Sequence, residues 1–219
     1  MDIDIERYGH FSFDMWLTLI RSHPEFKEER NKWMQEYLQL RSPLERIREV
    51  VRQVDIDANK DSEQRGIQYS QIELFREVVG RLQEHLPKDF DWGAFLEAQE
   101  RLFLHYMPEL IDPTIGELFE AIKAQGKHIS ILSNTAFIAG RSLRKVLVHY
   151  GLDKYFSFQL YSDELKSSKP DRSVFRKAYW EASALRPLQA KDFLHIGDNP
   201  IADYQGALDA GYSALLVER

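Results

Sequence analysis

The chain has 219 residues and a formal net charge of −6, with 43% hydrophobic and 29% charged residues. This composition is typical of a soluble globular protein that is long enough to bury a core. An acidic chain without a run of basic residues is a poor candidate for binding nucleic acid or an anionic membrane surface. There is no cysteine, which excludes thiolate nucleophiles, disulfides and zinc–thiolate sites. Any metal must therefore be held by oxygen or imidazole ligands, and carboxylates suit magnesium.

No apolar run approaches the length of a membrane span, and the first ten residues, MDIDIERYGH, are too polar for a secretory signal. We therefore expect a cytoplasmic protein.

The first part of the chain combines one short strand with a long helical region. Residues 8–13, YGHFSF, are aromatic and lead into Asp14, which is typical of a buried strand that ends at a carboxylate. From residue 21 to residue 111, apolar residues recur at helical spacing among many charges. Helices are predicted over 25–40, from Pro43 onward, over 67–86 and from Asp91 onward.

After Pro113, strands and helices alternate. Strands are predicted at 128–132, 156–161, 193–196 and 214–217, and helices at 115–124, 142–150, 172–183 and 201–210. This alternation predicts an α/β fold, a doubly wound parallel sheet with right-handed crossovers. Residues 1–20 and 112–219 should form this core domain, and residues 21–111 should form an inserted all-helical cap domain.

Several polar residues lie at or near the carboxyl ends of the predicted strands, where ligands bind in such sheets. Each has an ordinary structural explanation by itself, such as a turn, a helix cap or a solvated loop lysine. Their joint occurrence in this order is much more specific, and two nearby acids are a natural magnesium site. The residues are Asp14, Ser133 with Asn134, Lys169, and Asp198 with Asp203.

These residues resemble the motifs of the haloacid dehalogenase-like hydrolases. That family carries Asp-x-Asp-x-Thr, then Ser or Thr, then Lys, then Gly-Asp-x-x-x-x-Asp, each after a strand of a doubly wound sheet. The stretch GDNPIADYQGALDAG is an especially close match to the fourth motif and the helix after it. The matching residues are Asp14 with Thr18, Ser133, Lys169, and Asp198 with Asp203.

The resemblance implies a role for each of these residues. Asp14 would be the nucleophile that forms a covalent aspartyl intermediate with a small phosphorylated substrate. Mg²⁺ would be held by Asp14, the backbone carbonyl of Trp16, Asp198 and Asp203. Phosphate binding would fall to Ser133, Asn134 and Lys169, with Thr18 in a supporting role. A divalent cation would screen the repulsion between the Asp14 carboxylate and the anionic phosphate.

The sequence departs from the family at the acid/base position. The family's phosphatases carry a second Asp two residues after the nucleophile, and this chain has Trp16 there. An indole cannot exchange a proton in the relevant pH range. Loss of a positioned acid/base commonly costs about 10²- to 10⁴-fold in rate. Leu17 also replaces the usual Gly.

Three hypotheses follow. The first is a magnesium-dependent phosphatase whose leaving group needs little protonation, or whose acid comes from the cap, with His23, Arg41 and Lys60 as candidate donors. The second is cleavage of carbon–phosphorus or carbon–halogen bonds, since the family's phosphonatases borrow a cap lysine and its 2-haloacid dehalogenases carry Tyr at the position of Trp16. The dehalogenases need no metal, however, and the intact GDNPIAD argues against that chemistry. The third is a family member that binds a phosphorylated ligand or a partner protein without turnover. Retention of the charged residues Asp14, Lys169, Asp198 and Asp203 argues against this third hypothesis.

Three other features have simpler explanations. His195 should be a hydrogen-bonded core histidine, and Asp171 should cap the helix that follows it. Trp33 and Tyr37 should belong to the core of the cap.

Overall fold

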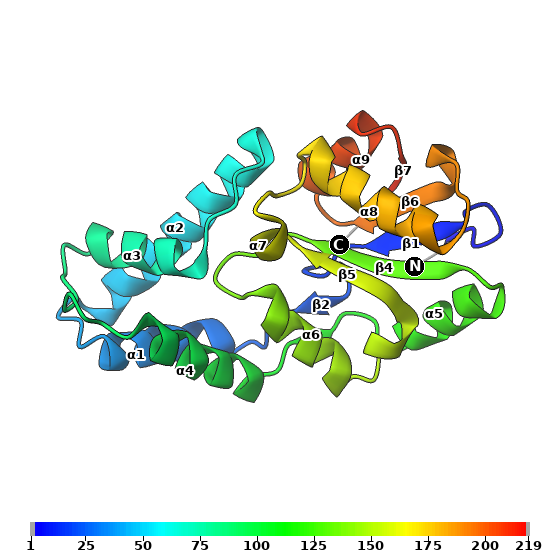
Figure 1. Cartoon of the computed structure of the whole chain (residues 1–219). Coiled ribbons are helices and arrows are strands. Elements are labelled where there is room, and N and C mark those ends of the chain that lie inside the picture. The colour runs from blue at the N-terminus through cyan, green and yellow to red at the C-terminus, as the bar shows by residue number, and fades with distance from the viewer. Residues whose placement is uncertain (1–2, 218–219) are drawn as a thin grey trace.

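Five parallel strands form the central sheet of the computed structural model, which describes residues 3–217 (Figure 1). The strand order is β5-β4-β1-β6-β7, and each neighbouring pair is parallel. Since β1 lies between β4 and β6, the direction of winding changes beside β1, which is where such sheets bind ligands. The predicted α/β class is confirmed. The strands are β1 (His10–Phe13), β4 (His128–Ser133), β5 (Phe156–Tyr161), β6 (Phe193–Gly197) and β7 (Ser213–Leu216).

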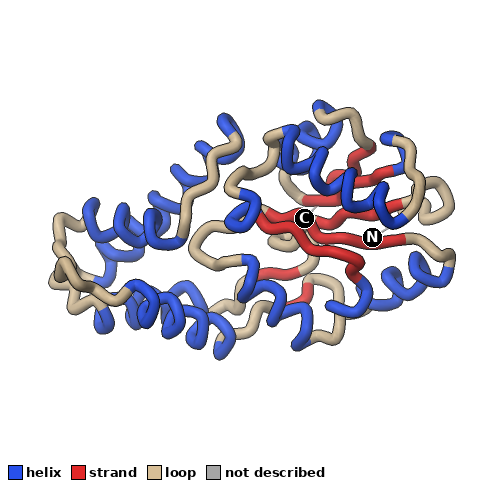
Figure 2. The backbone as a smooth tube through the Cα atoms, in the orientation of Figure 1, coloured by secondary structure: helices blue, strands red, loops and turns tan. Residues whose placement is uncertain are grey.

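Helices cover both faces of this sheet (Figure 2). On one face, α5 (Ile115–Ala124) and α6 (Gly140–His149) bury their apolar sides against the strands. On the other face lie α8 (Arg172–Leu185), capped by Asp171 as predicted, and the short α9 (Gly206–Asp209). The remaining short elements are α7 (Ser162–Leu165) and 3₁₀ turns at Asp153–Tyr155 and Ala190–Asp192.

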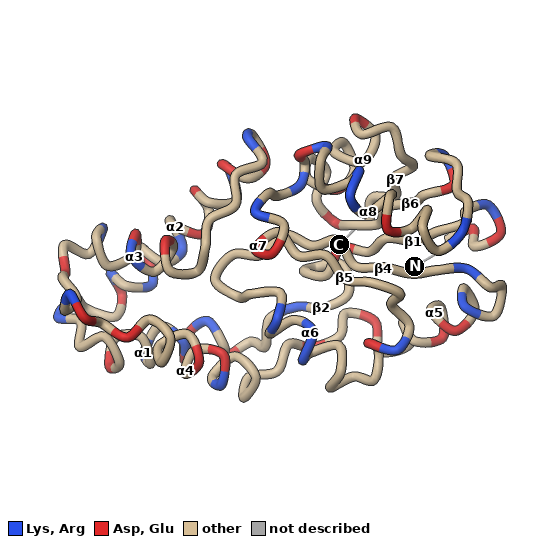
Figure 3. The backbone as a smooth tube through the Cα atoms, in the orientation of Figure 1, with Lys and Arg blue, Asp and Glu red and all other residues tan. Residues whose placement is uncertain are grey.

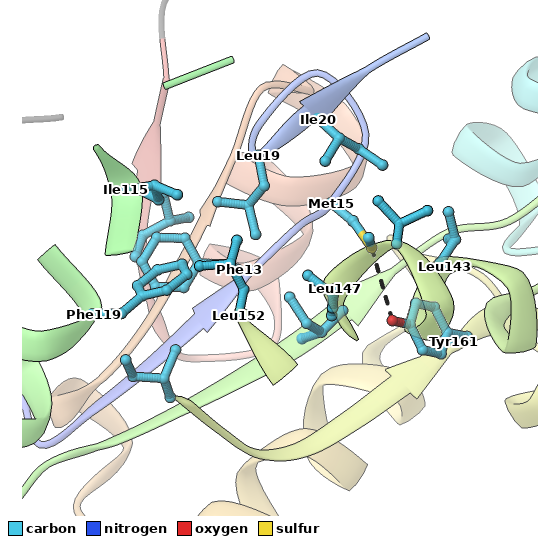
Figure 4. Packing of buried hydrophobic residues seen from close by; sticks show 14 of the residues in the cluster. Phe13, Met15, Leu19, Ile20, Ile115, Phe119, Leu143, Leu147, Leu152 and Tyr161 are labelled. Carbon is cyan, nitrogen blue, oxygen red and sulfur yellow. Dashed lines mark hydrogen bonds between the residues drawn. The ribbon is translucent and has the colours of Figure 1, made fainter. Parts of the chain in front are cut away.

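The core beneath α5 and α6 supports the end of β1 (Figure 4). Phe13 packs edge-on against Phe119 of α5, with ring centroids 5.2 Å apart. The next residue on this face, Met15, accepts a hydrogen bond at its sulfur from the Tyr161 hydroxyl at 3.7 Å. Full burial of each such side chain stabilises the fold by about 1.5–3 kcal/mol. The loop that follows β1, which contains Asp14, is therefore anchored on a packed core.

The four helices between β1 and β3 pack around an apolar core of their own beside one end of the sheet (Figure 1). Local signals set their ends: Ser70 and Glu73 form a capping box at the start of α3, and Gly66 ends α2 with φ of 66°. Trp33 and Tyr37 pack on Phe95 in this core, as predicted. The helices are α1 (Phe26–Tyr37), α2 (Leu44–Arg65), α3 (Gln71–Arg81) and α4 (Trp92–His105).

The two connections between the helical block and the sheet run side by side as a small antiparallel pair that was not predicted. It consists of β2 (Ile20–Arg21) and β3 (Glu109–Leu110). Arg21 Nε donates to Glu109 Oε2 at 3.0 Å across the pair. The division into a core of 1–20 and 112–219 and a cap of 21–111 stays a prediction, and this pair lies at its boundaries.

Charged residues are distributed as expected for a buried sheet. Figure 3 shows Lys, Arg, Asp and Glu residues spread along the helices, whereas β1 and β4 contain none of these four types. None of the helices within residues 3–217 combines the length and the apolar character needed to cross a lipid bilayer.

The predicted helix at 201–210 differs from the observed structure. Residues Pro200–Gln205 form a π-helical turn, and only Gly206–Asp209 are α-helical. The Asn199 side chain accepts hydrogen bonds from the backbone N–H groups of Ile201 and Ala202, while the Asp203 carboxylate accepts one from the Asn199 N–H. These bonds draw Asp203 back toward the end of β6.

Candidate active site

Asp14 and Asp198 directly follow adjacent parallel strands, and Ser133 ends a third. Phe13, the last residue of β1, is paired with Ile131 of β4 and with Ile196 of β6. The register therefore brings the carboxyl ends of these three strands to one edge of the sheet. The structure brings together the residues that the sequence analysis selected at strand ends.

The Asp14 carboxylate is buried, with 6% of the residue exposed, and it is held by three side chains. Ser133 Oγ donates to Oδ1 at 2.9 Å, and Lys169 Nζ donates to the same oxygen at 2.7 Å. Thr18 Oγ1 makes a long hydrogen bond of 3.5 Å to Oδ2. Oδ1 is thus tightly engaged, and Oδ2 is the less restrained oxygen.

Lys169 is 1% exposed and lies between two acidic side chains. Its ammonium group donates to Asp14 Oδ1 at 2.7 Å, to Asp203 Oδ1 at 2.6 Å and to the Leu132 carbonyl at 2.7 Å. Burial alone would lower the pKa of Lys169, but the two carboxylates outweigh burial and raise it. Lys169 therefore stays a cation and supplies fixed positive charge beside Asp14.

Asp203 is held in place by contacts on both of its oxygens. His195 Nε2 lies 3.1 Å from Oδ1, and the Asn199 N–H donates to Oδ2 at 3.0 Å. Burial opposes ionisation of Asp203, but Lys169 and His195 outweigh burial and hold the pKa of this carboxyl below its ordinary value. His195 Nδ1 also lies 3.0 Å from the Ser12 hydroxyl, which confirms His195 as a hydrogen-bonded core residue.

The pKa of Asp14 shifts in the opposite direction to that of Asp203, because burial is the dominant effect on Asp14. Burial raises it to about 7; Lys169 opposes this rise, and the carboxylates of Asp203 and Asp198 add to it. The accumulated negative charge at this point favours a bound cation, which would lower the pKa of Asp14 again.

Three carboxylates are arranged as a cation site. Asp14, Asp198 and Asp203 each offer one oxygen, and these oxygens lie within 4.8 Å of one another. Oxygen-only ligands in a solvent-accessible pocket fit a hard divalent ion such as Mg²⁺. The residues present therefore fit the implied metal, with the Trp16 backbone carbonyl still a predicted fourth ligand.

The loop after Asp14 has an unusual backbone. Leu17 has φ of 58°, in the left-handed region that glycine adopts at little cost. This conformation would suit the Gly that the family motif leads us to expect at this position. The Trp16 ring packs edge-on against Phe103 of α4, with centroids 6.2 Å apart, and Trp16 lines the pocket. Trp16 therefore lies at the same pocket as the Asp14 carboxylate.

The side chain of Asn134, which was predicted to bind phosphate, is instead bonded to the backbone of Lys169. Its side-chain nitrogen donates to the Lys169 carbonyl at 2.9 Å, and its side-chain oxygen accepts from the Lys169 N–H at 2.8 Å. The amide therefore fixes the backbone of the lysine that contacts Asp14. The backbone N–H of Asn134 is still predicted to bind phosphate.

A pocket of about 370 Å³ opens above these residues, within the size range of small-molecule sites. One wall is formed by the sheet ends and the loop after β4, and the other by α1 and α2. Ser133 and Thr18 contact Asp14 but are not among the lining residues. The polar and charged residues of α1 and α2 that line the pocket are Lys27, Arg30, Asp55, Asn59, Ser62 and Glu63.

None of the predicted cap donors lines this pocket: His23, Arg41 and Lys60 are all absent from its walls. The residues that do line it carry a signal that sequence analysis missed. Asp55, Asn59 and Ser62 recur at spacings of four and three along α2 and so share one face of that helix. The other buried residues of α2 are mainly apolar, so this row of polar residues identifies the side of α2 that faces the pocket.

Comparison with known proteins now identifies the family. A family model described as haloacid dehalogenase-like hydrolase matches residues 8–211. The chain belongs to the haloacid dehalogenase-like hydrolases. Membership in this family agrees with the α/β core described above.

Curated relatives of this hydrolase match over parts of their length. Over 140 residues, 64% of the chain, it is 33% identical to haloacid dehalogenase-like hydrolase domain-containing protein 3 of Mus musculus, covering 46% of that protein. Over 75 residues, 34% of the chain, it is 40% identical to rhythmically expressed gene 2 protein of Drosophila melanogaster, covering 28%. Over 76 residues, 35% of the chain, it is 41% identical to a phosphoserine phosphatase of Thermus thermophilus, covering 29%. The chain thus spans less than half the length of these relatives.

Solved structures share the fold of this hydrolase. The HAD-hydrolase YfnB of Bacillus subtilis, in a form bound to magnesium, has a TM-score of 0.71 at 19% identity, covering 96% of this chain and 89% of that one. A 2-haloacid dehalogenase of Pseudomonas syringae has a TM-score of 0.61 at 22% identity, covering 95% and 86%. At these identities the likeness concerns the fold alone.

Proposed function

We propose that this hydrolase is a magnesium-dependent enzyme that cleaves a small phosphorylated molecule through a covalent intermediate on Asp14. The observation that carries the proposal is the environment of that carboxylate. Asp14 is bonded to Ser133 and Lys169 and also shares a cation-sized cluster with Asp198 and Asp203. The phosphatase name of one relative and the magnesium-bound form of one structural neighbour support it.

When bound, Mg²⁺ would be held by Asp14, Asp198, Asp203 and the Trp16 carbonyl, and it would screen the repulsion between carboxylate and phosphate. Lys169 and Ser133 fix the orientation of Asp14 through Oδ1. The less restrained Oδ2 is then the oxygen best placed to react.

The proposed reaction has two steps. In the first, Asp14 forms a bond to phosphorus while the bond from phosphorus to the leaving oxygen breaks, and that oxygen departs with the electron pair. In the second, water attacks phosphorus, inorganic phosphate is released and the Asp14 carboxylate is regenerated. Because Trp16 supplies no proton to the leaving oxygen, we expect substrates whose leaving group is weakly basic, such as aryl, enol or acyl phosphates.

One observation favours carbon–phosphorus cleavage as a second candidate function. Lys27 of α1 lines the same pocket as Asp14. The family's phosphonatases, which also lack the second Asp, use a cap lysine. Carbon–halogen cleavage is less favoured, because the dehalogenases need no metal and this site gathers three carboxylates.

A graded set of leaving groups tests the proposal. Initial rates are measured with acetyl phosphate, p-nitrophenyl phosphate, sugar phosphates, phosphonoacetaldehyde and 2-chloropropionate, with Mg²⁺ and with EDTA, using Asp14→Asn as control. The proposal predicts Mg²⁺-dependent turnover of the activated phosphates that Asp14→Asn abolishes. Turnover of phosphonoacetaldehyde alone, lost in Lys27→Gln, would establish the second candidate instead. Absence of turnover across the whole set, in folded protein that binds Mg²⁺, would contradict both.

A further inference from the structure

The wall of the pocket formed by the helical block contains an arginine on an aromatic surface. Arg30 of α1 is partly buried and lines the pocket together with Asp14. Its guanidinium carbon lies 5.8 Å from the centre of the Phe26 ring and 5.5 Å from the centre of the Phe137 ring. Phe26 belongs to α1 and Phe137 to the loop after β4, so the two rings hold the guanidinium from two segments far apart in sequence.

This guanidinium has no carboxylate partner of its own. Its Nε and Nη2 donate to the side-chain oxygen of Asn31, at 3.3 and 3.1 Å. Among residues 3–217, no carboxylate lies within 4.0 Å of the Arg30 nitrogens, and the two hydrogen bonds leave Nη1 uncommitted. A cation that is removed from water without a paired anion is costly, so this arrangement favours an anionic ligand.

The other charged groups on this wall do not remove that preference. Burial lowers the pKa of Arg30 to about 10, with Asp55 opposing the shift, so Arg30 is a cation at neutral pH. Asp55 acts on Arg30 electrostatically without forming an ion pair, and Glu63 is bonded to Asn199 Nδ2 at 2.7 Å. Lys27, three residues before Arg30, is exposed and adds positive charge on the same side of α1.

We propose that Arg30 binds a carboxylate group of the substrate, so that the enzyme prefers small phosphorylated carboxylic acids. A planar guanidinium with an uncommitted donor nitrogen matches a carboxylate, and its contacts with two rings restrain its position. The proposal rests on the proposed function, in which Asp14 receives the phosphate at the opposite wall. Together with the missing proton donor at Trp16, it selects acids whose phosphate is carried on an aryl, enol or acyl oxygen.

Two probes that differ by one charge test this proposal. They are 4-carboxyphenyl phosphate and its amide, 4-carbamoylphenyl phosphate, which have similar shape and similar leaving groups. In the wild type, KM for the acid should be roughly 10- to 100-fold lower than KM for the amide, as a charged hydrogen bond in a pocket implies. Arg30→Gln should bring the two KM values together by weakening binding of the acid, and Arg30→Lys should retain part of the difference. Lys32→Gln is the matched control, because Lys32 lies on the same helix and pairs with Glu29 away from the pocket.

Binding measured by calorimetry in Asp14→Asn with Mg²⁺ separates this proposal from the proposed function. If the wild type turns over neither probe while Asp14→Asn binds the acid more tightly in an Arg30-dependent way, then the proposed phosphatase activity is wrong and carboxylate recognition stands. Equal affinity for the two probes in protein with an intact Arg30 would overturn the inference. So would an equal loss of affinity for both probes in Arg30→Gln, since that result assigns Arg30 a packing role only.

Discussion

The Asp203 side chain occupies the space that any side chain at Gly197 would need. A Cβ atom added to Gly197 would lie 2.2 Å from Asp203 Cγ, far inside van der Waals contact. Gly197 ends β6, and Asp203 lies in the π-helical turn that follows it. The absence of a side chain at one position therefore allows the acidic group of the other to reach Lys169.

Gly197→Ala should displace Asp203 and disrupt both the carboxylate cluster and the contact with Lys169. We expect a loss of stability of about 1–3 kcal/mol from overpacking, together with loss of Mg²⁺ binding. Urea unfolding and calorimetric Mg²⁺ titration measure the two effects. Gly80→Ala is the control, because a Cβ at Gly80 of α3 meets no atom within 4 Å and should stabilise the helix by about 0.5–1 kcal/mol. Wild-type Mg²⁺ affinity in Gly197→Ala would show that Asp203 is not a ligand.

Lys169→Met should leave the carboxylates of Asp14 and Asp203 buried without their shared cation. Breaking a buried ion pair by removing one partner costs about 3–5 kcal/mol, so the variant should be strongly destabilised in EDTA. A divalent cation can replace part of the missing charge, and Mg²⁺ should therefore stabilise the variant more than it stabilises the wild type. Urea unfolding with EDTA and with Mg²⁺ checks both effects.

Lys177→Met provides the comparison for that experiment. Lys177 forms an exposed ion pair with Glu181 at 2.5 Å, and loss of such a pair should change stability by less than about 1 kcal/mol. A similarly small effect in Lys169→Met would contradict the role of Lys169 as the buried counterion.

Trp16→Asp should place a carboxyl group at the position where the family motif leads us to expect an acid/base residue. We expect turnover of alkyl phosphates to rise by on the order of 10²-fold, because the leaving oxygen can then be protonated. Trp16→Asn loses the same packing against Phe103 without gaining an acid, so it separates the chemical effect from the structural one. Equal rates in the two variants would show that a different group sets the leaving-group preference.

His10 should make the folded state sensitive to acid. Burial, with a smaller effect of His128, lowers the pKa of His10 to about 3 in the folded state. The pKa of a histidine in the unfolded state is about 6.5. Between these values the unfolded state binds more protons, so the free energy of unfolding falls as pH falls, by up to about 1.4 kcal/mol per pH unit. His10→Phe keeps the stacking on Phe158 and Phe193 but removes the titration. Urea unfolding from pH 7 to pH 4 should give a shallower pH slope for His10→Phe, and an unchanged slope would contradict this origin.

The sequence was most informative where local chemistry and topology coincide. The observed bounds of β5, Phe156–Tyr161, and of α5, Ile115–Ala124, are those predicted, since apolar patterning and turn residues define both. Asp14 and Asp198 were predicted to meet because parallel strands bring their carboxyl ends to one edge. That inference needed the order of strands and helices together with the family resemblance, which assigned both residues to one magnesium site.

Other parts of the site depend on interactions between distant segments. The helix faces that carry Arg30 and Asp55 are set by how α1 and α2 pack beside the sheet, which periodicity alone does not specify. The π-helical turn at Pro200–Gln205 depends on hydrogen bonds of Asn199 and Asp203 that helix propensity does not describe. The two-residue strands β2 and β3 are too short to show a period.

Hydrogen bonds link the end of α2, which lines the pocket, to the backbone of the buried Lys169. Near the end of α2, Ser62 Oγ contacts the Lys169 carbonyl at 3.3 Å and accepts from Asn134 Nδ2 at 3.1 Å, and the Gly66 carbonyl accepts from the Ser168 N–H at 3.0 Å. Movement of α2 away from the sheet would break these bonds. The same bonds hold the backbone of Lys169, whose ammonium group contacts Asp14. The hydrogen bonds that hold the end of α2 over the pocket are therefore also the bonds that fix the backbone of Lys169.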